Sequence, residues 1–253
     1  MSSSLKMESH NLTGQTFGYT AAGLDYLAEE GTTEYTLVTL VVDESSSVSA
    51  YRDELERCLQ EAVKSCRLSP RADYLLLRVL AFNQNYREIH GFKPLVDCNT
   101  YDYIGCLHPS GMTALYYTDK NAITATIAYG VDLEENDFTV NALIITITDG
   151  MDNRSERDHG VSSSDVKDDL AEANRNEALE SILTVLVGVG TKDDPDISRY
   201  LEDFKNEAGM AQYIDIEDAD EKSLARLSDF ISRSVSSQSQ ALGSGKSSQP
   251  LAF

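Results

Sequence analysis

Short runs of apolar, mostly β-branched residues alternate along this chain with longer segments whose apolar positions recur at helical spacing. Residues 36–42 (TLVTLVV) form a continuous apolar run, which is typical of a strand buried on both faces. Between residues 49 and 66 the apolar positions are instead separated by three, one, three, one and three residues, which is the spacing of a helix. Strands that alternate with helices predict βαβ units, and therefore a mostly parallel sheet.

The same reasoning places the remaining elements. We expect further strands at residues 74–82, 142–148 and 182–189, a short edge strand at 213–216, and an antiparallel return at 86–92. We expect helices at residues 113–129, within 165–183, at 197–206 and at 221–235. The predicted fold is α/β: a Rossmann-like, doubly wound, mostly parallel central sheet with an antiparallel edge strand and helices on both faces.

The chain divides into one domain and two ends. Its 253 residues suffice for one α/β domain of ordinary size. Residues 1–33 are expected to form an N-terminal extension, of which the more apolar part, 17–29, has enough apolar character to pack on the domain. Residues 34–235 are expected to form the domain. Residues 236–253 are rich in serine and glutamine, which predicts a flexible tail.

Charge and cysteine content restrict the classes of partner. The chain has 42 acidic and 21 basic side chains, and a net charge of −21 disfavours binding to nucleic acids or to anionic membranes. No run of apolar residues is long enough for a transmembrane helix, and the polar first residues do not form a secretory signal. Four cysteines in so long a chain do not make a disulfide framework, so we expect a reducing, cytoplasmic location.

Oxygen-bearing side chains gather where the predicted central strands end. In a doubly wound sheet, ligands bind outside the carboxyl ends of the strands. Asp43, Ser45 and Ser47 follow the first strand at intervals of two, Asp149 follows another central strand, and Thr113 opens a helix after a glycine-containing loop. Carboxylates and hydroxyls are hard ligands, so these five residues predict an octahedral, partly open site for Mg²⁺, with Mn²⁺ or Ca²⁺ as alternatives.

A structural interpretation of the same residues competes with the metal site. Asp43 and Asp149 could serve as turn residues after strands, and Ser47 and Thr113 could cap the helices that follow them. Each residue taken alone favours this simpler interpretation. The occurrence of all five together, each next to a strand end or a helix start, favours the metal site.

The order of these motifs resembles the von Willebrand factor type A domain with its metal-ion-dependent adhesion site (MIDAS). The resemblance covers roughly residues 34–235 and rests on DxSxS at residues 43–47, on Thr113 and on the sequence Thr-Asp-Gly at 148–150. It implies that the two serines bind the metal directly, that the two aspartates bind directly or through water, and that the threonine joins or leaves the coordination shell. The sequence departs from the family where Ser46 replaces the usual glycine and where the loop reads SGMTAL.

The resemblance also implies a function. The family consists mostly of binding modules in which an acidic side chain of a partner protein fills the vacant metal position. We expect an adapter of the intracellular bacterial or phage type, of which some work beside AAA+ ATPases. The residues expected at the rim of the site are Glu44, Gly111, Met112 and Asp152.

Two other functions compete with the adapter function. Phosphotransferases of the haloacid-dehalogenase type also begin with an aspartate after a first strand, but they need a second aspartate two residues later as general acid. That position is Ser45 here, so we expect no enzymatic activity. The second alternative is a structural subunit of a larger assembly, for example a virion or an ATPase complex, in which the metal site is incidental.

Overall fold

The computed structural model describes residues 7–11, 18–29 and 31–253. The strands of this part are β1 (Met7–Asn11), β2 (Gly18–Ala22), β3 (Glu34–Asp43), β4 (Leu75–Phe82), β5 (Tyr86–Pro94), β6 (Thr139–Thr148), β7 (Ile182–Val189) and β8 (Gln212–Ile216). The α-helices are α1 (Leu24–Glu29), α2 (Arg52–Arg67), α3 (Leu115–Glu134), α4 (Ser155–His159), α5 (Ser163–Ala173), α6 (Pro195–Ala208) and α7 (Glu221–Gly243). Every strand and helix predicted from the sequence is present, with boundaries that differ by a few residues in most cases.

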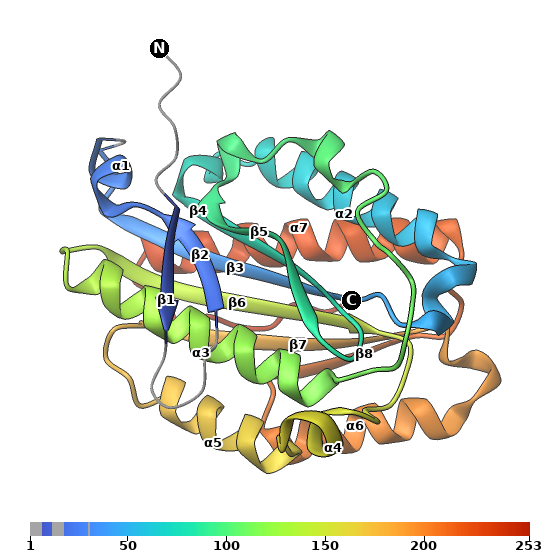
Figure 1. Cartoon of the computed structure of the whole chain (residues 1–253). Helices are drawn as coiled ribbons and strands as arrows, with labels where there is room; N and C mark the ends of the chain where they lie inside the picture. Colours follow the sequence, from blue (N-terminus) through green and yellow to red (C-terminus); the bar gives the residue numbers. More distant parts are fainter. Residues whose placement is uncertain (1–6, 12–17, 30) are drawn as a thin grey trace.

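One sheet joins all the described strands, in the order β1-β2-β5-β4-β3-β6-β7-β8 (Figure 1). Strands β4, β3, β6, β7 and β8 are mutually parallel, and β5 returns antiparallel to β4. The predicted α/β, Rossmann-like fold is thereby confirmed. The sheet continues past β5, because β2 pairs with β5 in parallel and β1 pairs with β2 in antiparallel orientation.

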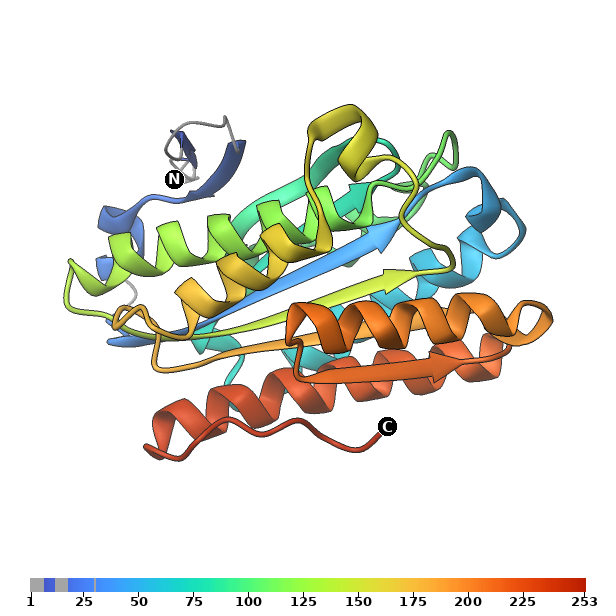
Figure 2. The same cartoon turned by 90° about the horizontal axis from the view of Figure 1, so that it is seen from below.

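Helices cover both faces of the sheet, which explains why the central strands are apolar without interruption. On β3, Val38, Leu40 and Val42 pack into the cluster that also contains the apolar residues of α2 and α7. The alternate residues Leu37 and Val41 pack into two clusters on the opposite face, which include residues of α3, α5 and α6. Figures 1 and 2 show these two helical layers. Both sets of β3 side chains are therefore removed from water.

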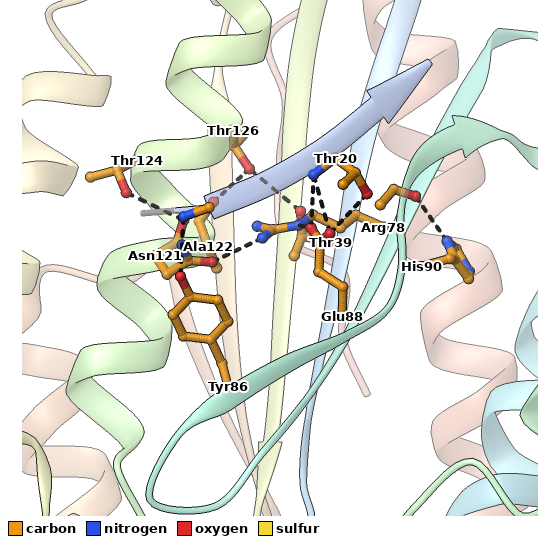
Figure 3. A network of polar contacts seen from close by, with 12 residues as sticks. Thr20, Thr39, Arg78, Tyr86, Glu88, His90, Asn121, Ala122, Thr124 and Thr126 are labelled. Carbon is orange, nitrogen blue, oxygen red and sulfur yellow. Dashed lines mark hydrogen bonds and ion pairs between the residues drawn. The ribbon is translucent and has the colours of Figure 1, made fainter. Parts of the chain in front are cut away.

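A buried ion pair fastens β2 to the rest of the sheet. The fully buried guanidinium of Arg78, on β4, donates to Glu88 (2.7 Å) and to Asn121 (2.9 Å) (Figure 3). Glu88, on β5, also accepts hydrogen bonds from the backbone N–H (3.1 Å) and the hydroxyl (2.8 Å) of Thr20 on β2. A buried charge is stable only with such partners, so β2 completes the environment of the pair.

The N-terminal part of the chain is more integrated than an extension. The sequence predicts an N-terminal extension at residues 1–33, of which 1–6, 12–17 and 30 lie outside the described residues. In the described part, Tyr19 and Ala21 on β2 are fully buried, and Leu27 on α1 joins the same apolar cluster. The apolar character of residues 17–29 therefore corresponds to an added strand and a short helix.

The C-terminal end also differs from the predicted flexible tail at residues 236–253. Helix α7 continues to Gly243, and its buried face includes Gln238, whose backbone oxygen accepts a hydrogen bond from Asn141. The chain then runs back along α7 (Figure 2), and the ring of Phe253 lies 5.7 Å from that of Phe230, between centroids. Hydropathy does not reveal this, because polar residues make up the buried face of the last helical turns.

All four cysteines are free and buried. Burial raises the pKa of Cys58 and of Cys66 to about 12. Across residues 7–11, 18–29 and 31–253, no helix combines the length and the apolar character needed to cross a bilayer.

Substitution of Gly91, on β5, can show whether the docking of β2 contributes to the stability of the fold. A Cβ atom at this position would lie 2.0 Å from the carbonyl oxygen of Thr20, so we expect Gly91→Ala to push β2 away from the buried ion pair. The free energy of unfolding, measured with urea, should fall by about 2 kcal/mol or more. Gly18→Ala is the matched control, because a Cβ atom there meets nothing within 4 Å. Equal stability of the two variants would contradict the prediction.

Candidate metal centre

The five predicted ligands lie beyond the carboxyl ends of β3 and β6, where the chain leaves these two strands toward opposite faces of the sheet. Strands β3 and β6 are neighbours, and Val42 pairs with Ile147 near their carboxyl ends. After β3 the chain enters α2 on one face of the sheet, whereas after β6 it enters α4 and α5 on the other face. Loops that leave neighbouring strands in opposite directions open a crevice between them. Asp43 ends β3 and Asp149 follows β6, so both border this crevice.

A line of hydrogen bonds connects the two carboxylates. The backbone N–H of Ser45 donates to one oxygen of Asp43 (2.7 Å), and the Thr148 hydroxyl donates to the other (2.6 Å). The hydroxyls of Ser45 and Ser47 lie 3.0 Å apart, and Ser47 donates to Asp149 Oδ1 (2.8 Å). The structure therefore brings four of the predicted ligands, Asp43, Ser45, Ser47 and Asp149, together in one network of hydrogen bonds.

Thr113 approaches the same place from the loop that precedes α3. A Cβ atom built on Gly150 would lie 3.8 Å from the Thr113 hydroxyl oxygen, so the threonine faces the loop that follows β6. Asn153 fixes it, because the Asn153 side chain accepts from the Thr113 N–H (3.0 Å) and the Asn153 N–H donates to the Thr113 carbonyl (2.9 Å). Ser46 donates from its N–H (3.2 Å) and its hydroxyl (3.0 Å) to Gly111 O, and so joins the two loops.

Gly111 and Met112 lie exposed beside the centre, as predicted for its rim. The backbone of Gly111 has φ +72°, a conformation that residues with a side chain rarely adopt. A Cβ atom there would also lie 2.0 Å from the side-chain oxygen of Gln84, which accepts a hydrogen bond from the Met112 N–H (3.2 Å). Glycine is thus required for the loop that carries Thr113.

The other two residues predicted for the rim turn inward. Glu44 is buried, and its carboxylate accepts from Arg87 (2.7 Å) and from the backbone N–H of His108 (2.9 Å). Asp152 accepts from the backbone N–H groups of Tyr116 and Ser155 (both 3.1 Å), at the first turns of α3 and α4. Both carboxylates hold the surrounding loops in place through these bonds, Glu44 buried and Asp152 half-buried.

The electrostatics of the centre favour a cation. Burial, together with the charge of Asp149, raises the pKa of Asp43 to about 7, and burial also raises the pKa of Asp149. Within the described residues, neither carboxylate forms an ion pair with a lysine or an arginine. A buried carboxylate (Asp43) beside a half-buried one (Asp149), without a cationic partner, is costly, and a bound cation stabilises their charged forms.

The donor set fits a hard divalent ion. No group of three or more His, Cys, Asp or Glu side chains that could hold a metal occurs in the described part of the chain. This centre contributes two carboxylates, and the hydroxyls of Ser45, Ser47 and Thr113 supply the remaining oxygen donors. Such a set suits Mg²⁺, which often keeps some of its coordination positions for water or for an external ligand.

Tyr51 is a neighbour of the centre that the sequence did not single out. It precedes α2, and its phenol lies close to Asp149, so that burial and this carboxylate raise the pKa of Tyr51. From the sequence, the residue belongs to a predicted helix, and nothing in the spacing separates it from the other tyrosines. Asn153 was missed for the same reason, because its role depends on how two loops meet.

Comparisons with solved structures identify the fold. The PilB minor pilin from Streptococcus sanguinis matches with TM-score 0.56 and 13% identity, over 83% of this chain and 63% of that one. The pilus adhesin SpaC from Lactobacillus rhamnosus GG matches with TM-score 0.57 and 11% identity, over 81% and 31%. Proximal thread matrix protein 1 from the mussel byssus, in a structure with a zinc-occupied MIDAS motif, matches with TM-score 0.52 and 17% identity, over 81% and 46%.

These similarities concern the fold alone. The chain spans less than two thirds of the length of each of these three proteins. No protein-family model matches the sequence, and no curated protein matches it either. The sheet order, the helical layers and the structural neighbours together show a von Willebrand A-like α/β fold.

Another buried carboxylate, Asp119, belongs to α3. Asp119 is fully buried and accepts a hydrogen bond from Thr146 on β6 (2.6 Å) at one oxygen, while its other oxygen has no partner among the described residues. Burial raises the pKa of Asp119 to about 7, above its ordinary value of 3.8. The folded state therefore holds a proton on Asp119 that the unfolded chain releases at lower pH.

Replacement of Asp119 by asparagine should change how stability depends on pH. Because the folded-state pKa is raised, this group destabilises the wild-type fold as pH rises from about 4 to about 7, by up to about 4 kcal/mol. Asp119→Asn cannot ionise, so its stability relative to wild type should increase across the same range and stay constant above it. Urea unfolding at several pH values measures the difference, with the exposed Asp168→Asn as control. A difference that does not vary with pH would refute the prediction.

Proposed function

We propose that this domain is a metal-dependent protein-binding module. It holds one Mg²⁺ ion through Asp43, Ser45, Ser47, Thr113 and Asp149, and an acidic side chain of a partner protein completes the coordination. The observation that carries the proposal is the hydrogen-bonded line between buried Asp43 and half-buried Asp149 at the ends of neighbouring strands, neither of which has a cationic partner among the described residues.

The chemistry of such a centre suits reversible binding. When bound, the metal ion supplies positive charge to Asp43 and Asp149 and an open position for an external oxygen ligand. The hydroxyls of Ser45 and Ser47 add donors without adding negative charge, so the ion keeps attraction for a further carboxylate. The zinc-occupied MIDAS motif of the mussel protein supports a divalent ion in this fold, and Mn²⁺ or Ca²⁺ could replace Mg²⁺.

The proposal is a binding function and not catalysis. Ser45 occupies the position at which a phosphotransferase of comparable layout needs its general acid, and here it links Asp43 to Ser47. The proposed setting is the cytoplasm of a bacterium or a phage-infected cell, with an AAA+ ATPase as one class of partner. Four buried thiols that form no disulfide are consistent with that compartment.

The metal centre can be tested by removing one carboxylate at a time. We expect Asp43→Ala and Asp149→Ala each to weaken Mg²⁺ binding by about a hundredfold or more, since each removes a charged donor. Titration calorimetry measures the binding, and circular dichroism shows whether the fold persists. Asp168→Ala, at an exposed position on α5, is the control. Wild-type protein that binds none of Mg²⁺, Mn²⁺ and Ca²⁺ would refute the proposal.

The partner can be sought with the metal as the variable. A tagged copy of the domain should capture a protein from the native lysate in Mg²⁺ and lose it in EDTA, as read by mass spectrometry. Asp149→Ala should fail to capture the same protein in Mg²⁺. A partner retained in EDTA, or a homo-oligomer that persists in it, would instead favour a structural subunit in which the metal site is incidental.

A further inference from the structure

Large apolar side chains that remain exposed gather on one part of the described surface. Four of them belong to the connection between β5 and α3, and the fifth lies directly after α2. We call these residues the apolar stripe, and they are Leu68, Val96, Tyr101, Ile104 and Met112. Their exposed fractions range from 41% for Met112 to 82% for Leu68. Scattered exposed apolar residues need no explanation, whereas their concentration on one connection indicates a contact surface.

Hydrogen bonds hold the connection between β5 and α3 along α2, and the last part of this connection lies at the metal centre. The Arg67 side chain donates to Cys98 O (2.9 Å), near the far end of α2, and Glu56 accepts from the N–H of Gly105 (2.7 Å), near its start. These anchor points are separated by about 16 Å of helix. At the other end of the connection, Gly111 O accepts from Ser46 (Figure 1 shows the course of the chain). The stripe therefore leads to the rim of the centre.

This flank of the centre is electrically neutral. Residues 104–113 (IGCLHPSGMT) contain no aspartate, glutamate, lysine or arginine. The acidic side chains that adjoin them point inward: Glu44 is paired with Arg87, and Glu56 is buried against the N–H groups of Gly105 and Leu107. Farther along the connection, the exposed carboxylate of Asp102 lies 3.8 Å from the Lys93 ammonium, which balances its charge. A partner carboxylate bound at the metal can therefore approach across residues 104–113 without meeting an exposed carboxylate of that segment.

The opposite flank is acidic. Tyr51, beside Asp149, lies near Gly190, so the connections that follow β7 and β8 form this side of the rim. Of its basic side chains, Lys192 pairs with Asp218 and Arg199 pairs with Asp196. The exposed acidic residues there are Asp194, Asp196, Glu217 and Asp218. Because like charges repel at close range, an acidic segment is disfavoured on this side.

We infer that the partner segment that supplies the acidic metal ligand continues along the apolar stripe with large apolar side chains. The inference rests on the proposed function, because it needs the acidic ligand at the metal. The length of α2 is about 24 Å, which an extended segment of about seven residues spans. The occupant is thus an extended protein segment with one acidic residue and, within about seven positions, two or more large apolar residues.

Synthetic peptides can test this partner chemistry directly. Each peptide has one aspartate. In the apolar peptides the positions beside it carry leucine and phenylalanine, in the second set they carry serine, and in the third set they carry lysine. In Mg²⁺, we expect the apolar peptides to bind wild-type protein at least about tenfold more tightly than the serine peptides, since each partly buried apolar side chain contributes to affinity. Fluorescence anisotropy of labelled peptides measures the dissociation constants.

Variants of the stripe identify where the preference arises. Tyr101→Ser combined with Ile104→Ser should remove the preference for apolar peptides and leave Mg²⁺ affinity unchanged, because neither residue belongs to the centre. The control combines two exposed changes on other helices, Lys167→Ser and Lys222→Ser, and should keep the preference. Near-ultraviolet circular dichroism checks that both double variants remain folded.

The outcomes separate this inference from the proposed function. If the protein binds no divalent ion, the proposed function fails, and the inference fails with it. If Mg²⁺ binds but apolar and serine peptides bind equally, or neither binds, the inference alone is overturned. A Mg²⁺-independent dimer that the stripe variant abolishes would also overturn it, because the stripe would then bind a second copy of the chain. Sedimentation of wild type and variant in EDTA measures that dimer.

Discussion

The parallel pairing of β3 with β6 is the interaction on which the rest of the site depends. It brings Asp43 and Asp149 to neighbouring strand ends, where the Thr148 hydroxyl bridges to the Asp43 carboxylate. Both strands are buried on both faces, so helices from either side enclose their ends and leave Asp43 buried and Asp149 half-buried. A sheet that buries its central strands thereby also creates the partly desolvated acidic pair on which the proposed cation site rests.

The loops around this pair are constrained by one another. Ser46 binds Gly111, Asn153 binds Thr113, and the inward carboxylate of Asp152 ties α3 to α4. The hydroxyl of Ser46 therefore strengthens the link between the first and second loops. These bonds hold the hydroxyl donors in place, which lowers the entropic cost of binding at the proposed metal site.

The sequence predicted the parts of this structure that depend on local pattern. Continuous apolar runs identified the central strands, and the positions after those strands identified the residues that now lie in the hydrogen-bonded line. The sequence could not predict which acidic side chains near the centre face outward. The inward orientation of Glu44, for example, depends on its ion pair with Arg87, which is distant in the sequence. The docking of β2 was hidden likewise, since it depends on Glu88 and on the missing side chain of Gly91.

The net charge of −21 is not the charge that the proposed acidic partner would meet at the site. Exposed charges act over a screening length of roughly 8 Å at physiological ionic strength, so the immediate rim decides the outcome. Here the flank formed by residues 104–113 carries no charged side chain, and the other flank carries exposed aspartates. For the proposed acidic partner, the acidic flank would oppose the wrong orientation, whereas the uncharged flank would permit approach. The same excess of negative charge can therefore give the site its direction.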